Sequence, residues 1–195
     1  MDVVPTTLTS ELESVFTSRD GADVTLCCGE ERLAAHSFVL CLRSPVLRAL
    51  LRGPLASDLS AVPVPSFVQA DVMKRVLQFI YTDALEPSSP EEAQHLLAAG
   101  DHFGLTRLVS ICAAHLASSL TVENASFALT LASQHGADGL RDATLRFVAK
   151  NAAAVVGTPG WAHLKAACPE LVEAVMLTAA TGAPPPGKGK RARET

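Results

Sequence analysis

The stretch DVTLCCGEERLAAHSFVLCLRSPVLRALL, residues 23–51, carries the clearest structural signals in the chain. Two short apolar runs on either side of Gly29 and Glu30 predict a β-hairpin, because a connection that contains glycine favours a tight turn. Residues 37–51 then predict two short helices. Pro45 suits the first turn of the second helix, and Ser44 is a suitable N-cap residue.

The sequence on both sides of this stretch has a mainly helical pattern. Residues 7–16 predict a helix with four apolar residues on one face, Leu8, Leu12, Val15 and Phe16. The prolines of residues 61–65 predict a short strand at a sheet edge. Residues 69–83 predict one helix, and residues 89–120 predict two. A small β element among several helices indicates the α+β class.

The remainder of the chain changes character after residue 120. Helices are expected over 122–134, 137–150, 159–167 and 169–179, and Thr121 with Asn124 gives only a weak capping signal. The segment TGAPPPGKGKRARET is rich in proline and glycine and then basic, so it is expected to be disordered. The expected organisation is therefore a disordered start (1–7), an α+β domain (8–120), a helical extension (121–180) and a disordered basic tail (181–195).

Composition restricts the class of protein. Of 195 residues, 48% are hydrophobic and 18% are charged, so most of the chain can form a packed core. Aromatic residues make up only 5%, which favours helices over a β-sandwich. The net charge of −4 argues against a nucleic-acid-binding or membrane-surface protein, since either is usually basic.

Cysteine usage and targeting signals point to the cell interior. The chain has five cysteines and no C-x-x-C pair, which is typical of reduced thiols in the nucleus or cytoplasm. The first sixteen residues lack the basic region and the apolar core of a signal peptide. No apolar run approaches the roughly 20 residues that span a bilayer.

A search for catalytic and metal-binding motifs finds none. The six histidines are dispersed and form neither H-E-x-x-H nor a zinc-binding spacing with cysteine. Phosphate-binding, dinucleotide-binding and nucleophile-elbow motifs are also missing from the sequence. A cysteine–histidine pair assembled in space stays open. The expectation is a protein without enzymatic activity, cofactor or metal.

Three groups of residues invite a functional interpretation. The apolar face of residues 7–16 either packs on its own domain or forms a two-fold dimer interface. Asp23, His36 and Arg43 lie beside apolar segments, so they form either a structural polar cluster or part of a partner-binding surface. In the tail, four basic residues fit either a solvated end or a nuclear-import signal: Lys188, Lys190, Arg191 and Arg193.

The stretch 23–51 resembles the BTB/POZ domain, through Asp23-Val24, Ala35-His36, Val39-Leu40 and the run Arg43 to Val46. VLQFIYTDAL (76–85) and LLAAGDHFGLTRLVSICAAHL (96–116) continue the likeness in the same order. The sequence from Leu120 to Asn151 resembles the helical 3-box that opens a BACK-like region, and residues 160–176 extend it. The strongest likeness is to the BTB half of speckle-type POZ protein and of the plant BTB-MATH proteins.

This resemblance implies a function in protein interaction. In that family the BTB domain dimerises and docks cullin-3, and the protein serves as a substrate adaptor for a RING ubiquitin ligase. The cullin contact uses a hydrophobic residue, any residue, and then glutamate in the loop after the second helix. In an ungapped alignment the hydrophobic position falls on Leu55 and the acidic position on Ser57, with Asp58 next to it. The docking surface is expected to include this loop, the helices of 96–116 and the 3-box at 120–131.

The resemblance also leaves alternatives open. Only a few residues precede the first predicted helix, where the substrate-binding MATH domain would stand. The chain is then a fragment or a short product, binds an unidentified substrate through its own surfaces, or pairs with a MATH-bearing relative. The expected partners are cullin-3 and a second BTB chain, with no nucleic acid and no membrane. A nuclear scaffold or co-regulator without ligase function is the alternative, because a fold alone does not determine function.

Overall fold

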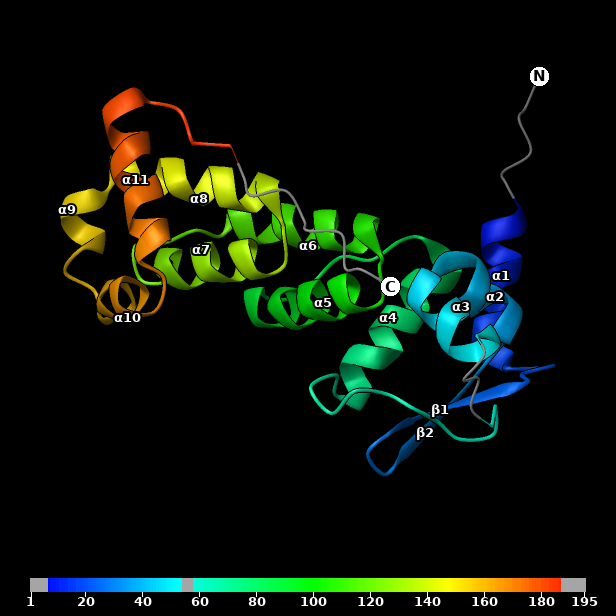
Figure 1. Ribbon diagram of the computed structural model, residues 1–195. Helices are drawn as coiled ribbons and strands as arrows, with labels where there is room; N and C mark the ends of the chain where they lie inside the picture. Colours follow the sequence, from blue (N-terminus) through cyan, green and yellow to red (C-terminus); the bar gives the residue numbers. More distant parts are fainter. Residues whose placement is uncertain (1–6, 54–57, 187–195) are drawn as a thin grey trace, which may run out of the picture. The chain divides into compact units, whose positions relative to one another are not determined.

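The computed structural model describes residues 7–53 and 58–186, and the chain divides into two compact units, Met1–Val109 and Ser110–Thr195. The first unit contains the strands and the second is helical (Figure 1). The class is α+β with a helical extension, as the sequence predicts.

A three-stranded sheet in the order β2-β1-β3 lies in the first unit. The hairpin is formed by β1 (Val24–Cys28) and β2 (Glu31–Ala35), which pair in antiparallel register with Leu26 opposite Leu33. Gly29 has φ +62° at the first position of the turn, where glycine avoids the strain that a side chain would cause. The short β3 (Val62–Pro63) pairs parallel to β1 at the sheet edge, where proline is tolerated.

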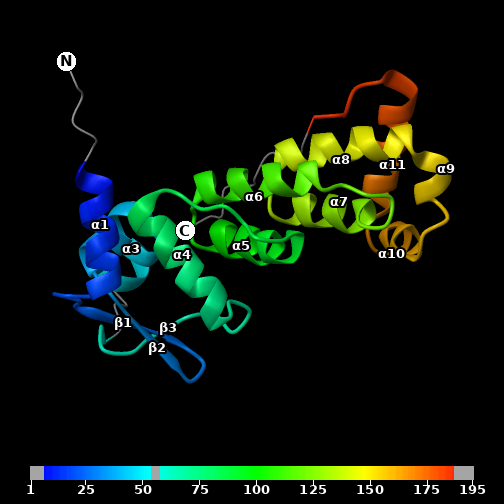
Figure 2. The same cartoon turned by 180° about the vertical axis from the view of Figure 1, so that it is seen from behind.

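Helices cover this sheet and supply most of the first unit. In chain order they are α1 (Thr7–Ser18), α2 (Ser37–Arg43), α3 (Pro45–Arg52), α4 (Ala70–Thr82), α5 (Pro90–His102) and the start of α6 (Thr106–Ser118). Helix α4 is central, since α1, α2 and α5 all pack against it (Figures 1 and 2). The largest fully buried side chains in this unit come from the sheet and from α2 to α6, and they include Leu26, Leu40, Leu47, Phe79, Ile80, Leu97 and Leu108.

The Ser44-Pro45 pair connects two distant parts of the first unit. The hydroxyl of Ser44 accepts a hydrogen bond from the backbone N–H of Leu47 (3.0 Å), which confirms it as the N-cap of α3. The same hydroxyl donates to the carbonyl of Phe103 (2.6 Å), 59 residues away. Gly104 has φ +70°, and a Cβ there would lie 2.8 Å from Cγ of Pro45. Glycine is therefore required where the chain between α5 and α6 meets the start of α3.

The second unit is built from helical hairpins. Its elements after α6 are α7 (Ala125–Gln134), α8 (Asp138–Lys150), α9 (Ala152–Val155), α10 (Pro159–Ala167) and α11 (Pro169–Thr181). Helix α8 packs against α7 and α11, and α10 packs against both α7 and α11. The four predicted helices are present, with α7 three residues shorter at its start, and the one-turn helix α9 was not predicted.

The turn before α7 accounts for its later start, at Ala125 instead of the predicted residue 122. The side chain of Asn124 accepts from the backbone N–H of Thr121 (2.8 Å), and the hydroxyl of Thr121 accepts from the N–H of Asn124 (3.3 Å). This reciprocal pair resembles a capping box in which asparagine replaces the usual glutamate or glutamine, and it closes the turn that precedes the helix. Asn124 is itself the N-cap residue of α7 and its side chain makes no cap bond to the helix, so α7 begins at Ala125 and not at residue 122.

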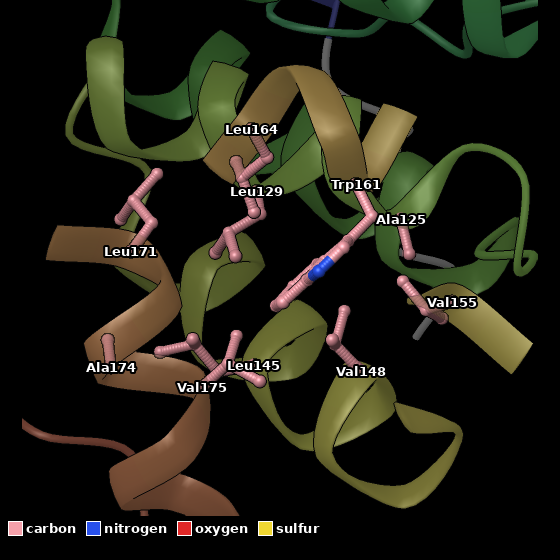
Figure 3. Packing of buried hydrophobic residues seen from close by; sticks show 10 residues of the cluster. All are labelled: Ala125, Leu129, Leu145, Val148, Val155, Trp161, Leu164, Leu171, Ala174 and Val175. Carbon is pink, nitrogen blue, oxygen red and sulfur yellow. The ribbon is translucent and has the colours of Figure 1, made fainter. Parts of the chain in front are cut away.

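An apolar cluster around Trp161 forms the core of the second unit. Its ten buried members come from five helices and are labelled in Figure 3: Ala125, Leu129, Leu145, Val148, Val155, Trp161, Leu164, Leu171, Ala174 and Val175. The indole of Trp161 points into the centre of the cluster, toward Leu145 and Val148. Because aromatic rings bury a large apolar area, this side chain contributes more than any other single member to the packing.

Candidate functional site

The predicted cullin-binding loop follows α3. Leu55 and Ser57 lie outside the described residues, and Asp58 is described. The carboxylate of Asp58 accepts from the N–H of Ser60 (2.9 Å) and from its hydroxyl (2.7 Å). These bonds, the backbone N–H first, lower the pKa of Asp58. Asp58 is therefore an exposed, ionised group whose two oxygens already serve a local turn.

The apolar face of α1 packs partly on its own domain. Leu12, Val15 and Phe16 are half-buried, and the ring of Phe16 lies 5.3 Å from that of Tyr81 on α4, centroid to centroid. Leu8, at the start of the helix, is 65% exposed. The four residues predicted as a dimer interface thus separate into three that are half-buried on a helix packed against α4 and one that faces solvent.

Two further apolar side chains are exposed on α2. Phe38 is 67% exposed and Leu42 is 62% exposed, and they lie one helical turn apart on the face opposite the buried Leu40 and Cys41. Sequence reasoning missed this pair because the run SFVLCLR is apolar all round. An apolar residue on every face of a short helix is itself a signal, since one helix cannot bury all its faces against one layer.

Asp23 holds the start of α2. Its carboxylate accepts from the backbone N–H of Ser37 (2.6 Å) and from the hydroxyl of the same residue (2.6 Å). The hydroxyl bond and then the backbone bond lower the pKa of Asp23. An aspartate fourteen residues upstream therefore supplies the capping interaction that the local N-cap residue, His36, does not make.

His36 binds a different set of partners. Its Nδ1 lies 2.7 Å from the hydroxyl of Tyr81, and its Nε2 lies 2.8 Å from the carbonyl oxygen of Asp20. A carbonyl only accepts, so Nε2 carries the proton, and in the neutral ring Nδ1 accepts from Tyr81. The same hydroxyl accepts from the backbone N–H of His36 (2.9 Å), and burial raises the pKa of Tyr81.

Arg43 lies at the other end of α2 and pairs with Asp83. Asp83 also forms an ion pair with Arg107, whose Nε lies 3.0 Å from Oδ2 of Asp83. The guanidinium of Arg43 lies over the ring of Phe79, 5.7 Å from its centroid. The predicted polar cluster is thus two arrangements, with Asp23 and His36 at the start of α2 and Arg43 at its end. Both fix the helix that exposes Phe38 and Leu42.

The predicted 3-box region, residues 120–131, also exposes an apolar ring. Phe127 on α7 is 52% exposed, whereas Ala125 and Leu129 on the opposite face are buried in the Trp161 cluster. Thr121 and Asn124 bond each other in the turn before this helix, and Asn124 also donates to the carbonyl of Ser119 (2.9 Å). The helix is therefore fixed at the end that carries Phe127.

The structure bears in part on three further predictions, which concern the basic tail, membrane-spanning helices and metal ligands. The basic residues Lys188, Lys190, Arg191 and Arg193 lie outside them. Within residues 7–53 and 58–186, no helix is long and apolar enough to cross a bilayer. In the same ranges, no three or more His, Cys, Asp and Glu side chains gather as metal ligands would.

Comparison with known proteins follows the two-part organisation. The BTB/POZ domain family matches residues 12–120, and the BPM/SPOP BACK domain family matches residues 124–176. The chain is 35% identical over 182 residues to BTB/POZ and MATH domain-containing protein 3 of Arabidopsis thaliana, covering 87% of this chain and 45% of the relative. It is 31% identical over 192 residues to BTB/POZ and MATH domain-containing protein 6 of the same plant, covering 90% of this chain and 46% of the relative.

The chain thus spans about half the length of these curated relatives. The matches run in the order that the sequence motifs indicate, with the BTB signature first and the 3-box-like helices after it. The chain therefore belongs to the BTB/POZ family, with a BACK domain of the BPM/SPOP type after the BTB domain.

Proposed function

We propose that this protein is a dimeric interaction module that acts as a substrate adaptor, or as a regulator of one, for a cullin-3 RING ubiquitin ligase. The observation that carries the proposal is the direct succession of a BTB domain and a BACK domain of the BPM/SPOP type. In the family that the sequence resembles, the BTB domain dimerises and docks cullin-3.

The proposed adaptor performs no chemistry of its own. It raises the effective concentration of a bound substrate near the ubiquitin-charged enzyme that the ligase recruits. A dimer presents two such arms, so binding of a multivalent substrate strengthens without any new contact. If the chain pairs with a MATH-bearing relative instead, the mixed dimer carries one substrate arm fewer and the chain acts as a regulator.

The proposed cullin surface includes the loop after α3, where Leu55 supplies the apolar anchor. Phe127 of the 3-box, which is 52% exposed, is proposed separately as an aromatic contact on the second unit. Asp58 is a weak substitute for the glutamate of the family pattern, because Ser60 already occupies both of its oxygens. Ser57 therefore leaves the acidic position of the pattern unfilled, and binding is expected to be weaker than in relatives that carry glutamate.

Binding of the purified chain to the N-terminal region of cullin-3, measured by calorimetry, tests this surface. Leu55→Arg is expected to weaken binding at least tenfold, since an apolar anchor at an interface centre is worth more than about 1.4 kcal/mol. Ser57→Glu is expected to strengthen it by about twofold to fivefold. Val156→Arg is the matched control, because Val156 is 54% exposed in the second unit and outside the proposed surface. Absence of binding by the unmodified chain would remove the adaptor proposal.

The proposed dimer surface joins Leu8 on α1 with Phe38 and Leu42 on α2. All three are more than 60% exposed, and both helices pack on α4, which fixes them in one unit. Self-complementary apolar patches of this kind are the usual basis of two-fold dimers. Leu12 is less suitable for a test, because it is half-buried and a charge there would also disturb the packing of α1.

Sedimentation velocity of Leu42→Asp tests the dimer. The variant is expected to be monomeric at micromolar concentration, because an unpaired carboxylate in a packed interface costs several kcal/mol, roughly. Val156→Asp, with similar exposure, should leave the association state unchanged. An unchanged dimer in Leu42→Asp would place the interface elsewhere.

We propose that the protein acts in the nucleus, the cytoplasm or both. The basic residues of 188–193 support nuclear import. Deletion of residues 188–195 from a fusion too large for passive diffusion is expected to reduce nuclear accumulation. An unchanged distribution of that fusion would remove the import assignment. A nuclear scaffold without ligase function is the alternative, and a dimer that does not bind cullin-3 would favour it.

A further inference from the structure

A groove of about 450 Å³ opens in the second unit between α7, α8 and α11 and the residues that follow α11. Its apolar lining includes Leu171, Ala174 and Leu177 on α11 and Ala132 on α7. Leu177 is 48% exposed, so part of this apolar lining faces solvent. The groove belongs to neither the proposed cullin surface nor the proposed dimer surface.

The chain turns back over this groove after α11. Gly182 caps the helix with φ +74°, and the hydroxyl of Thr181 accepts from the N–H of Ala183 (3.3 Å). Pro184 and Pro185 are half-buried, and Pro185 and Pro186 line the groove. The proline-rich segment therefore packs on the unit instead of projecting from it, as Figure 1 shows for the red segment beside α8.

A buried arginine holds this segment. The side chain of Arg141 on α8 is only 11% exposed, and its Nη1 donates to the carbonyl oxygen of Pro185 (2.9 Å). The same atom lies 3.3 Å from Oδ1 of Asp142, which offsets the charge of the guanidinium. A buried guanidinium requires such acceptors, so release of Pro185 would leave a donor unsatisfied. The position of Pro185 is therefore fixed by the fold.

The solvent side of the groove is acidic. Asp138 at the start of α8 and Glu170 and Glu173 on α11 line the groove, and all three are exposed. The charge of Arg141 is already met by Asp142, so these carboxylates give the groove a net negative charge. An apolar floor with an acidic rim suits an occupant that carries basic side chains on a chain with aliphatic stems.

The residues after Pro186 have this chemistry. Residues 187–195 include four cations, Lys188, Lys190, Arg191 and Arg193, and one acidic residue, Glu194. They begin at the groove because Pro186 is part of its lining. Nine residues reach up to about 30 Å when extended, which exceeds what is needed to follow a groove of this volume. Their tethering gives a high effective concentration at the acidic rim.

We propose that the basic tail, residues 187–195, docks in this groove of its own chain, with its lysine and arginine side chains against Asp138, Glu170 and Glu173. The docked tail withholds its cations from other acidic partners. Its release exposes them, so the groove and a competing acidic receptor exclude each other. The proposal is independent of cullin binding and of dimer formation.

Trypsin removal of the tail from the full-length chain, followed by intact mass, tests the proposal. Trypsin cleaves after the four cations, and a docked tail is protected. The double variant Glu170→Gln with Glu173→Gln is expected to lose the tail about threefold to tenfold faster at low salt. This factor corresponds to the free energy that two exposed ion pairs contribute to docking. The matched control, Glu11→Gln with Glu13→Gln on α1, neutralises two exposed carboxylates in the other unit and should cleave at the unmodified rate.

Salt and concentration give two further readouts on the unmodified chain. Raising the ionic strength should accelerate its cleavage toward the rate of the double variant, because exposed ion pairs are screened. The rate should not depend on protein concentration, since the docking is within one chain. Equal rates for the double variant and the control would overturn the proposal, and so would protection that rises with concentration, which would indicate docking on a second copy.

Discussion

The two units of this protein hold their helices together in different ways. In the first, an apolar core is supplemented by side-chain hydrogen bonds and ion pairs between residues that are far apart in sequence, as in His36 with Tyr81, Ser44 with Phe103 and Arg43 with Asp83. In the second, an apolar cluster around Trp161 links five helices, and hydroxyls such as that of Thr144 bond the carbonyl one turn earlier.

The difference shows two separate contributions: specific hydrogen bonds fix the positions of elements, and burial of apolar side chains supplies most of the stability. A neutral hydrogen bond contributes only about 1 kcal/mol net, but it allows few arrangements of the two groups. A buried aromatic side chain contributes several times more and permits small shifts of the elements around it. The first unit is thus specified in detail around α2, which carries the exposed Phe38 and Leu42, whereas the second is stabilised mainly by one core.

Trp161→Ala is expected to have the largest effect on stability and to act on the second unit alone. Removing the ring should lower the free energy of unfolding of that unit by about 3–5 kcal/mol. Hydrogen exchange followed by mass spectrometry should show lost protection in residues 125–181 and retained protection in α4 and β1. Phe127→Ala, which removes an exposed ring, should cost under about 1 kcal/mol. Equal loss in both units would show that they share one cooperative transition.

Ser44→Ala should have an intermediate effect, confined to the first unit. It removes the cap of α3 and leaves the buried carbonyl of Phe103 without its donor, so we expect a loss of about 1.5–3 kcal/mol in urea denaturation. Ser89→Ala provides a control, because Ser89 caps α5 by accepting from Glu92 (3.1 Å) at a half-buried position. That change should cost about 1 kcal/mol. Similar losses in both variants would mean that the contact with Phe103 adds nothing.

Asp23→Asn should have the smallest effect and should depend on pH. The hydrogen bonds from Ser37 lower the pKa of Asp23 in the folded state, so its carboxylate contributes stability above its unfolded pKa of about 4. That contribution is lost as the pH falls through the folded pKa. We therefore expect the variant to be less stable by about 0.5–1 kcal/mol at neutral pH.

The difference between Asp23→Asn and the unmodified chain should shrink as the pH falls below about 4, as measured by thermal unfolding across pH. Asp20→Asn is the neighbouring control, because the structure uses the backbone carbonyl of Asp20 at His36. A stability difference for Asp23→Asn that stays constant down to acid pH would contradict the capping role of the carboxylate.

The sequence predicts features that depend on near neighbours. Ser44 and Pro45 mark the start of α3, Gly29 marks the hairpin turn, and the prolines at 159 and 169 mark the starts of α10 and α11. In each case the residue acts on backbone within a few positions of itself. The α+β class follows from the same local signals.

The sequence could not predict features that depend on tertiary contacts. Nothing in the neighbourhood of Asp23 indicates that it caps a helix fourteen residues later, or that Arg43 pairs with Asp83 across forty. The exposure of Phe38 and Leu42 was missed because a seven-residue helix with apolar residues on all sides does not reveal which face is buried. The hydrogen bond from Arg141 to the carbonyl oxygen of Pro185 joins α8 to the proline-rich segment after α11. Local sequence patterns give no sign that these two segments are in contact.

The proposal of a dimeric cullin-3 adaptor is tested most directly by the mass of the complex in solution. Light scattering after size exclusion should be measured on the full-length chain mixed with the N-terminal region of cullin-3. We expect a complex with two copies of each protein, and Leu42→Asp should reduce it to one copy of each. A chain that elutes apart from cullin-3, or that elutes as a monomer on its own, would contradict the proposal of a dimeric adaptor.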